Sequence, residues 1–416
     1  MLPISGLMCN IQNRRSIVFN ISLLGAGHFC SDFYANFLPA LLPFVMIKLG
    51  MSLTLSGMLV MVYSVISSVL QPFAGYLIDK YGYAWLILIT TPVSAVFICS
   101  AGLADSKITL FLLVGLAGLG ASIFHPLAAS LMGKVVTPET KGRAMSVFVF
   151  GGNVGCAVAP AIILYCLALG GISSLIFLII PGLLVTWASY LARLHKIDIR
   201  PVVKCGQDET APQGEQWYKS RGLILLNIVM ALRSWMQVAL ITFLPVALTS
   251  LGQSTAVIAS MLTVFMLSGA IGALLGGWVG DKIGRKAGFI GSLVVCLPVT
   301  YLFLLDMSPS LLGYVLLAVS GAMLQSTAPT SVVWAQELIP GNAAMASGMM
   351  LGLAFGLGGV GAAITGTLGD HIGLEAALLW SVLSIVGAIV LAVAIPQPGQ
   401  RKAKLNPLTV KASKLD

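Results

Sequence analysis

The stretch Gly276-Gly-Trp-Val-Gly-Asp-Lys-Ile-Gly-Arg-Lys286 is a short charged turn between two long apolar runs. A weaker copy, Gly75-Tyr-Leu-Ile-Asp-Lys-Tyr-Gly82, lies 202 residues earlier. Two glycines, an aspartate and a lysine coincide at this offset: Gly75, Asp79, Lys80 and Gly82 match Gly277, Asp281, Lys282 and Gly284. The repeat predicts a chain built from two related halves.

The composition predicts a membrane protein. Of the 416 residues, 58% are hydrophobic and only 9% are charged, whereas about 25% are charged in a soluble domain. So many apolar side chains cannot all be buried in one water-soluble core, and lipid must therefore cover much of the surface. We expect an all-α integral membrane protein.

Twelve membrane spans are predicted, because a helix needs about 20 apolar residues to cross a bilayer. The first run follows Arg14-Arg15 and is too long for a cleaved signal, so we interpret it as the first membrane helix. The spans cover residues 17–47, 53–78, 84–104, 108–133, 144–168, 172–192, 221–249, 255–279, 287–306, 310–336, 343–369 and 375–395. Kinks are expected at Pro39 and Pro43.

One long polar stretch divides these spans six from six. The expected domains are an N-terminal six-helix bundle (1–192), a cytoplasmic central loop (193–220), a C-terminal six-helix bundle (221–395) and a cytoplasmic tail (396–416). A cytoplasmic N-terminus places 20 of the 23 lysines and arginines on the cytoplasmic side. The net charge of +9 therefore indicates orientation in the membrane rather than binding to nucleic acid.

Motifs for enzyme chemistry or for metal binding are missing from the sequence. There is no Walker sequence and no HExxH motif, and the seven cysteines lack metal-ligand spacing. We expect no enzyme activity, no cofactor, no metal and no disulfide framework. Without a nucleotide-binding domain, an ion gradient is the expected energy source.

His28 and Asp32 are four residues apart on one face of the first helix, about halfway across. Ionisable side chains at that depth usually face a cavity or a helix interface, because lipid does not solvate them. We predict that Asp32 is the proton-coupling carboxylate and that His28 tunes it. The alternative is that Asp32 only hydrogen-bonds a neighbouring helix.

Arg233 is the one basic residue well inside a predicted span. The seventh helix corresponds to the first in the other half, so Arg233 and Asp32 could face one cavity. Arg233 would then bind an anionic substrate group or pair with a carboxylate. The alternative is that its side chain extends to the membrane surface.

The chain resembles the major facilitator superfamily of transporters over its whole length, since residues 277–286 match the loop signature between helices 8 and 9 of that superfamily. Within it, the sequence is most similar to the fosmidomycin resistance proteins. The residues that carry this closer match are Gly27-His28, Asp32, Leu70-Gln71-Pro72, Ile123-Phe-His-Pro126, Gly151-Gly-Asn-Val-Gly155 and Ala335-Gln-Glu-Leu-Ile-Pro-Gly341.

The resemblance also suggests roles for His125 in the fourth helix and for the small residues of the fifth helix. His125, before Pro126 in the fourth helix, is expected to line the cavity or relay protons, unless it only packs at a kink. The fourth helix lacks the arginine found in many superfamily exporters. Gly151, Gly152, Gly155 and Pro160 are expected to allow close helix packing, and they loosely resemble an antiporter signature without its Gly-Pro dipeptide.

Two further groups complete the predicted site. The polar positions that we expect to line the cavity, unless they make only structural hydrogen bonds, are Asn36, Tyr63, Gln71, Asn153, Gln237 and Gln325. All of these except Tyr63 are predicted to bind substrate. The expected cytoplasmic gate consists of the two repeated turns with Arg285, Lys286 and Glu337. Asp281 is expected to matter more than Asp79, because the first turn lacks the trailing basic pair.

The resemblance implies a monomeric alternating-access transporter of a bacterial inner membrane, with lipid, protons and a small-molecule substrate as its partners. Both termini are expected in the cytoplasm. The expected action is proton-driven export of a small drug-like or anionic compound. Proton-coupled uptake of a small organic anion and a transporter-like sensor that moves no substrate are the alternatives.

Overall fold

The computed structural model describes residues 4–136, 141–200, 220–339 and 349–395. Helices and short connections account for these ranges. In the first half they are α1 (Ile4–Ala35), α2 (Phe37–Leu49), α3 (Leu53–Val69), α4 (Gln71–Tyr81), η1 (Ala84–Leu86), α5 (Ile87–Ser100), η2 (Ala101–Leu103), α6 (Lys107–Val135), α7 (Lys141–Gly170), η3 (Ile172–Leu178), α8 (Ile179–Leu191) and η4 (Leu194–Lys196).

The second half repeats this plan. Its helices are α9 (Arg221–Ser250), α10 (Thr255–Ile283), α11 (Arg285–Asp306), α12 (Leu311–Leu338), η7 (Met349–Leu353), α14 (Ala354–Ile372), α15 (Leu374–Ser381) and α16 (Leu383–Ala394). In the described ranges, 11 helices are long and apolar enough to cross a membrane. The remaining predicted span, 343–369, begins in residues outside the description and continues through η7 and α14.

The first transmembrane helix is broken at Asn36, three residues before the expected kink. Pro39 has no N–H, so the carbonyl of Ala35 cannot receive its usual helical hydrogen bond. Asn36 leaves the helical region, with φ −97° and ψ 13°, and separates α1 from α2. The break places a polar side chain next to Asp32, one turn earlier.

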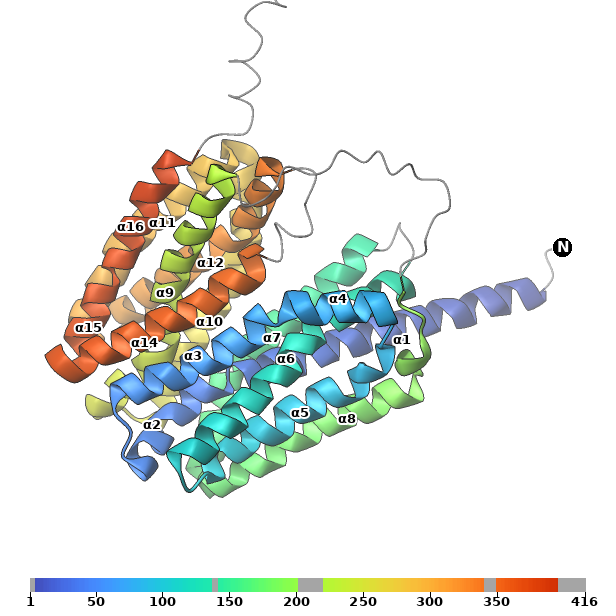
Figure 1. The fold of residues 1–416 in the computed structure, drawn as a ribbon, viewed down its shortest axis with the longest axis horizontal. Coiled ribbons are helices and arrows are strands. Elements are labelled where there is room, and N and C mark those ends of the chain that lie inside the picture. Colours follow the sequence, from blue (N-terminus) through green and yellow to red (C-terminus); the bar gives the residue numbers. More distant parts are fainter. Residues whose placement is uncertain (1–3, 137–140, 201–219, 340–348, 396–416) are drawn as a thin grey trace, which may run out of the picture.

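The two bundles meet at one end and diverge toward the other (Figure 1). Helix α3 packs along α14, α7 packs on α10, and α2 packs on α9. Gly57 of α3 and Gly366 of α14 face the partner backbone so closely that added side chains would collide with Ala362 and Leu53. We call this the closed end, and the end at which α4 finishes and α11 begins the open end.

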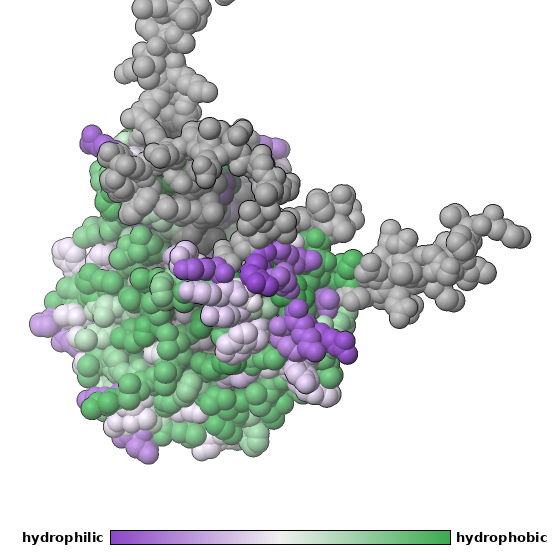
Figure 2. Space-filling view, turned by 45° about the vertical axis from the view of Figure 1, so that its right-hand side comes forward, coloured by the Kyte–Doolittle hydropathy of each residue, from purple (hydrophilic) through white to green (hydrophobic). Residues whose placement is uncertain are grey.

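The outer surface is mainly apolar, as lipid contact requires (Figure 2). Large exposed side chains include Phe150, Tyr165, Trp187, Leu274 and Leu311. Hydrophilic side chains gather in a patch on one part of the face drawn in Figure 2. This distribution agrees with the predicted membrane environment.

The two repeated turns lie at the open end, one in each half. Gly82 and Gly284 adopt positive φ angles of 70° and 92°, which explains why each turn ends in glycine. Arg285 Nε lies 3.7 Å from Glu337 Oε1, and Lys286 Nζ donates to the carbonyls of Val393 and Ile395. These contacts remain within the second half. The side chains of Asp79 and Asp281 lie outside the described part, so their predicted gating roles stay predictions.

Candidate functional site

A cavity of about 340 Å³ lies between the two halves. The first half contributes residues of α1 to α4, α6 and α7, and the second half contributes residues of α9, α10, α12 and α14. Its polar lining consists of Asp32, Asn36, Tyr63, Ser64, Ser67, Ser68, Gln71, His125, Asn153, Cys156, Gln237, Thr242 and Gln325. All six uncharged polar positions predicted to line the cavity belong to this lining.

Three ionisable side chains meet in the first half: Asp32 and His125 line the cavity, and His28 contacts Asp32. His28 Nε2 lies 3.3 Å from Asp32 Oδ2, and His125 Nε2 lies 3.5 Å from Asp32 Oδ1. The side chains of His28, Asp32 and His125 are 12%, 18% and 29% exposed, so the cluster is largely buried but still accessible to solvent. The structure thus brings together the three residues predicted for proton coupling.

The contact between His28 and Asp32 requires a proton on one of the two side chains. His28 Nδ1 lies 2.7 Å from the carbonyl oxygen of Phe148, which can only accept, so Nδ1 carries a hydrogen. In a neutral His28, Nε2 is then an acceptor that faces an ionised carboxylate. The contact with Asp32 is favourable only when His28 or Asp32 holds a further proton. Gain or loss of that proton changes the charge of the cavity wall.

The same three side chains have the spacing of metal ligands, although the sequence predicts no metal. One ligand atom from each of them lies within 4.8 Å of the others. Two imidazoles and one carboxylate are compatible with a divalent transition metal as well as with protons.

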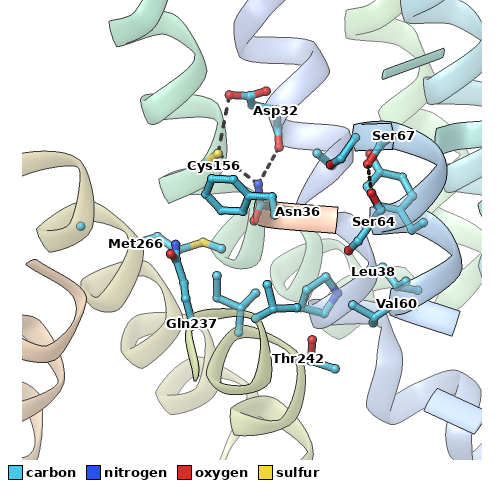
Figure 3. A pocket seen from close by; sticks show the side chains of 18 of the residues that line it. Asp32, Asn36, Leu38, Val60, Ser64, Ser67, Cys156, Gln237, Thr242 and Met266 are labelled. Atoms are coloured by element: carbon cyan, nitrogen blue, oxygen red, sulfur yellow. Dashed lines mark hydrogen bonds between the residues drawn. The ribbon is translucent and has the colours of Figure 1, made fainter. Parts of the chain in front are cut away.

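Cys156 is a member of the site that sequence reasoning missed. Asn36 Nδ2 donates to Cys156 Sγ at 3.0 Å and to the main-chain oxygen of Asp32 at 2.9 Å (Figure 3). Cys156 Sγ lies 3.8 Å from Asp32 Oδ2. A cysteine in an apolar run usually acts as a small hydrophobe, so the sequence alone does not single out Cys156.

The predicted glycines of α7 allow this arrangement. Side chains at Gly151 and Gly155 would collide with the main-chain oxygens of Gly25 and Phe29 in α1. A Cβ at Gly152 would lie 2.5 Å from Asp32 Oδ2 and 2.7 Å from His28 Nε2. The glycines therefore allow α1 and α7 to pack closely and leave room for the ionisable cluster. Pro160 lies farther along α7.

Arg233 occupies a different position from the one that the sequence predicts. Its side chain is fully buried in the second half and does not line the cavity. Its Nε and Nη2 atoms donate to the main-chain oxygen of Leu324 at 2.8 and 2.6 Å, and Nη2 also donates to Gln325 Oε1 at 2.5 Å. In this conformation Gln325, and not Arg233, faces the cavity.

A second carboxylate joins the two halves at the closed end. Asp370 accepts hydrogen bonds from the main-chain nitrogens of Leu53 and Thr54, each at 2.8 Å. These nitrogens begin α3, whose N-terminal dipole favours a negative charge. Partial burial acts to raise the pKa of Asp370, but hydrogen bonds from the Thr54 side chain and from the two main-chain amides hold it below its ordinary value.

The fold and the cavity define a multi-pass membrane transport protein with its site between two helical bundles. The chain belongs to the Major Facilitator Superfamily, whose sequence profile matches residues 24–214 and 223–415. The fold class and the resemblance predicted from the sequence are thereby confirmed.

Curated relatives cover most of this chain. It is 30% identical over 375 residues to the uncharacterized MFS-type transporter YfnC of Bacillus subtilis, a match that covers 89% of this chain and 91% of the relative. It is 28% identical over 385 residues to the fosmidomycin resistance protein of Escherichia coli, covering 90% and 92%.

Solved structures share the fold at low sequence identity. A bacterial homolog of the human lysosomal transporter Spinster, in an inward-facing and occupied conformation, has a TM-score of 0.76 at 16% identity, with 92% of this chain and 96% of the other covered. The nucleoside transporter NupG has a TM-score of 0.72 at 16% identity, with 91% and 98% covered.

Proposed function

We propose that this protein is a secondary active transporter of a bacterial inner membrane that works by alternating access. Protons moving inward through the Asp32 cluster would drive the export of a small drug-like or anionic compound. The observation that carries the proposal is the contact of Asp32 with His28 and His125 on a cavity wall between the two halves.

The arrangement of the halves supports alternating access. They pack tightly at the closed end, where Gly57, Gly366 and Asp370 cross the interface. They diverge at the open end, which is cytoplasmic in the topology predicted from lysines and arginines. The conformation described here is then inward-facing. Transport requires the two halves to separate at the closed end and to come together at the open end.

The proton gradient supplies enough energy for this function. One proton that crosses about 100 mV provides roughly 2.3 kcal/mol, which corresponds to about fifty-fold accumulation. A proton on the Asp32 cluster and a substrate whose hydrogen-bond donor binds the ionised Asp32 carboxylate would occupy the cavity alternately. Such exclusion is the physical basis of antiport.

Uptake of a small organic anion is a second candidate that two further relatives favour. One is described as a probable sulfoacetate transporter of Cupriavidus necator, at 21% identity over 347 residues. The other is the sialic acid transporter NanX of Escherichia coli, at 23% identity over 358 residues. Both names denote organic acids.

The sense of coupling is tested with the purified protein in liposomes that enclose a pH indicator. Substrate is added outside at equal internal and external pH, so that its own gradient drives it inward. Antiport predicts that the interior becomes alkaline, because each entering substrate releases protons from the lumen, whereas symport predicts that the interior becomes acidic. An alkaline shift supports export, and an acidic shift supports uptake. A substrate flux that moves no protons would contradict both.

A further inference from the structure

We propose that Arg233 is a positioning residue that fixes the amide of Gln325 and thereby makes the second-half wall a donor site for an oxyanion. The substrate would carry a phosphonate, carboxylate or sulfonate group toward Gln325. This inference rests on the proposed transport function and specifies the substrate class of the same cavity.

The contacts of Arg233 determine which way the Gln325 amide points. A guanidinium group has only donors, so the atom of Gln325 that it meets at 2.5 Å must be the oxygen Oε1. The neighbouring carbonyl of Leu324 receives two further bonds from the same guanidinium and holds it in place. Gln325 therefore turns its oxygen away from the cavity toward the buried arginine.

The other branch of the Gln325 amide is free to bind a ligand. Gln325 lines the cavity, and its Nε2 makes no hydrogen bond to any residue that the structure describes. This NH₂ group is a donor with two hydrogens. It suits a group that only accepts, such as the oxygen of an anionic substrate.

The charge of Arg233 adds to this preference. Within the described ranges Arg233 has no carboxylate within ion-pair distance, and its side chain is fully buried. A buried charge without a counter-ion is expensive, and its field is weakly screened in a low-dielectric interior. The second-half wall is therefore electropositive although the guanidinium does not touch the cavity.

The opposite wall presents acceptors. Asn36 Nδ2 is engaged by Cys156 and the main chain of Asp32, and Gln71 Nε2 donates to the main-chain oxygen of Ser67 at 2.9 Å. The amide oxygens of Asn36 and Gln71 remain available in the same cavity lining as the Asp32 carboxylate. The two walls thus favour a substrate with an anionic group at one end and a hydrogen-bond donor at the other.

Two buried polar atoms on the wall also indicate a polar ligand. The Tyr63 hydroxyl and the Gln237 Oε1 atom have no hydrogen-bond partner among the described residues. Their residues are only 8% and 7% exposed and line the same cavity. Buried polar atoms without partners are costly, and a polar substrate would satisfy them.

A double-mutant cycle tests the positioning role. We measure KM and kcat for fosmidomycin, used as a phosphonate probe, in Arg233→Lys, Gln325→Met and the double variant in liposomes. Each single variant is expected to raise KM about tenfold with little change in kcat, because a donor to the anion is lost or misdirected. The double variant is expected to resemble the single variants, since Arg233 acts through Gln325.

The matched control is Gln253→Met, which makes the same exchange of an amide for a thioether at a residue that does not line the cavity. With methylphosphonate as the probe, Gln253→Met should leave KM unchanged while Gln325→Met raises it. Thermal unfolding of every variant identifies a loss of folding. Additive effects of Arg233→Lys and Gln325→Met would mean that Arg233 contacts the substrate itself, and this would overturn the inference.

The same assays separate this inference from the proposed function. A wild-type protein that exchanges protons for quaternary ammonium cations and neither binds nor carries anions would overturn the inference and leave proton-coupled transport intact. A protein that binds methylphosphonate through Gln325 but moves no protons would support the inference and refute the coupling.

Discussion

Asp32 and Asp370 are two carboxylates of one chain with opposite surroundings. Asp32 lies on the cavity wall between two imidazoles, which can gain and lose protons. Asp370 lies at the closed end and accepts from two main-chain amides, whose charge cannot change. Because of this difference, we propose that Asp32 responds to a proton gradient, whereas Asp370 holds the two halves together at a constant charge.

Asp370 should not respond to pH in the physiological range. Its pKa is lowered from the ordinary 3.8 in the contact with α3. A carboxylate whose pKa is lowered by a contact stabilises that contact fully at pH values above its ordinary pKa. The stabilisation is lost as the pH falls through the lowered pKa. The Asp370 contact is therefore complete between about pH 5 and 8.

The largest expected effect is that of Asp32→Asn. This variant keeps the shape of the side chain and removes the carboxylate that we propose exchanges a proton with His28 and His125. Transport driven by a pH gradient should fall on the order of 100-fold, about 2.7 kcal/mol. Substrate exchange at equal pH should persist, and its loss together with a normal unfolding temperature would mean that Asp32 binds the substrate instead.

A smaller effect is expected at the crossing of α3 and α14. A Cβ at Gly57 would lie 2.5 Å from the oxygen of Ala362 and 2.7 Å from the Cα of Ala363. Gly57→Ala should force the halves apart at the closed end and slow transport about tenfold, a change of about 1.4 kcal/mol.

Cys156 provides a native reporter for this change, because it lines the cavity. In Gly57→Ala, an impermeant maleimide added on the side of the closed end should modify Cys156 faster, as read by mass spectrometry of its peptide. Gly291→Ala is the matched control, since nothing lies within 4 Å of a Cβ there. Equal labelling in the two variants would refute the closed-end assignment.

Asp370→Asn should have a milder effect. Loss of the negative charge weakens two hydrogen bonds to the start of α3, a change of about 1 kcal/mol or roughly fivefold. Transport should slow by that factor equally at pH 5.5 and pH 7.5. A defect that appears at only one of these pH values would show that Asp370 titrates in the working range.

The smallest expected effect concerns Cys156. Cys156→Ser retains an acceptor for Asn36 Nδ2, whereas Cys156→Ala removes it. We expect the alanine variant to change KM about twofold and the serine variant less. Transport assays at several substrate concentrations measure the difference. Equal KM values in the wild type and the alanine variant would mean that the bond between Asn36 Nδ2 and Cys156 Sγ does not position Asn36.

The sequence predicts the cluster well because its residues follow helix geometry. His28 and Asp32 share a face through their spacing of four, and the prolines near His125 and Asn36 mark the helices that bend. Sequence periodicity does not determine how α9 is rotated, so the burial of Arg233 behind Gln325 could not be derived. The helix breaks at Asn36, three residues before Pro39, because Pro39 has no N–H to donate to the carbonyl of Ala35. The sequence therefore marks the proline and not the position of the break.

The sequence contains a pattern around Asp370, but this pattern does not identify the start of α3 as the partner of Asp370. Gly369-Asp-His-Ile-Gly373 repeats the Gly-Asp-x-Ile-Gly pattern of Gly280-Asp-Lys-Ile-Gly284. Both copies end a helix at a glycine of positive φ, 88° at Gly373 and 92° at Gly284. The pattern marks an aspartate at the last turn of a helix, but only the structure identifies the start of α3 as its partner.

The most direct test of the central claim is the number of protons exchanged when substrate binds. The purified protein in weakly buffered detergent, mixed with a saturating transported anion, reports this number through a pH indicator dye. We predict that wild-type protein exchanges about one proton per bound substrate, that Asp370→Asn does the same, and that Asp32→Asn exchanges none. The same proton count in Asp32→Asn as in the wild type would contradict the assignment of coupling to Asp32.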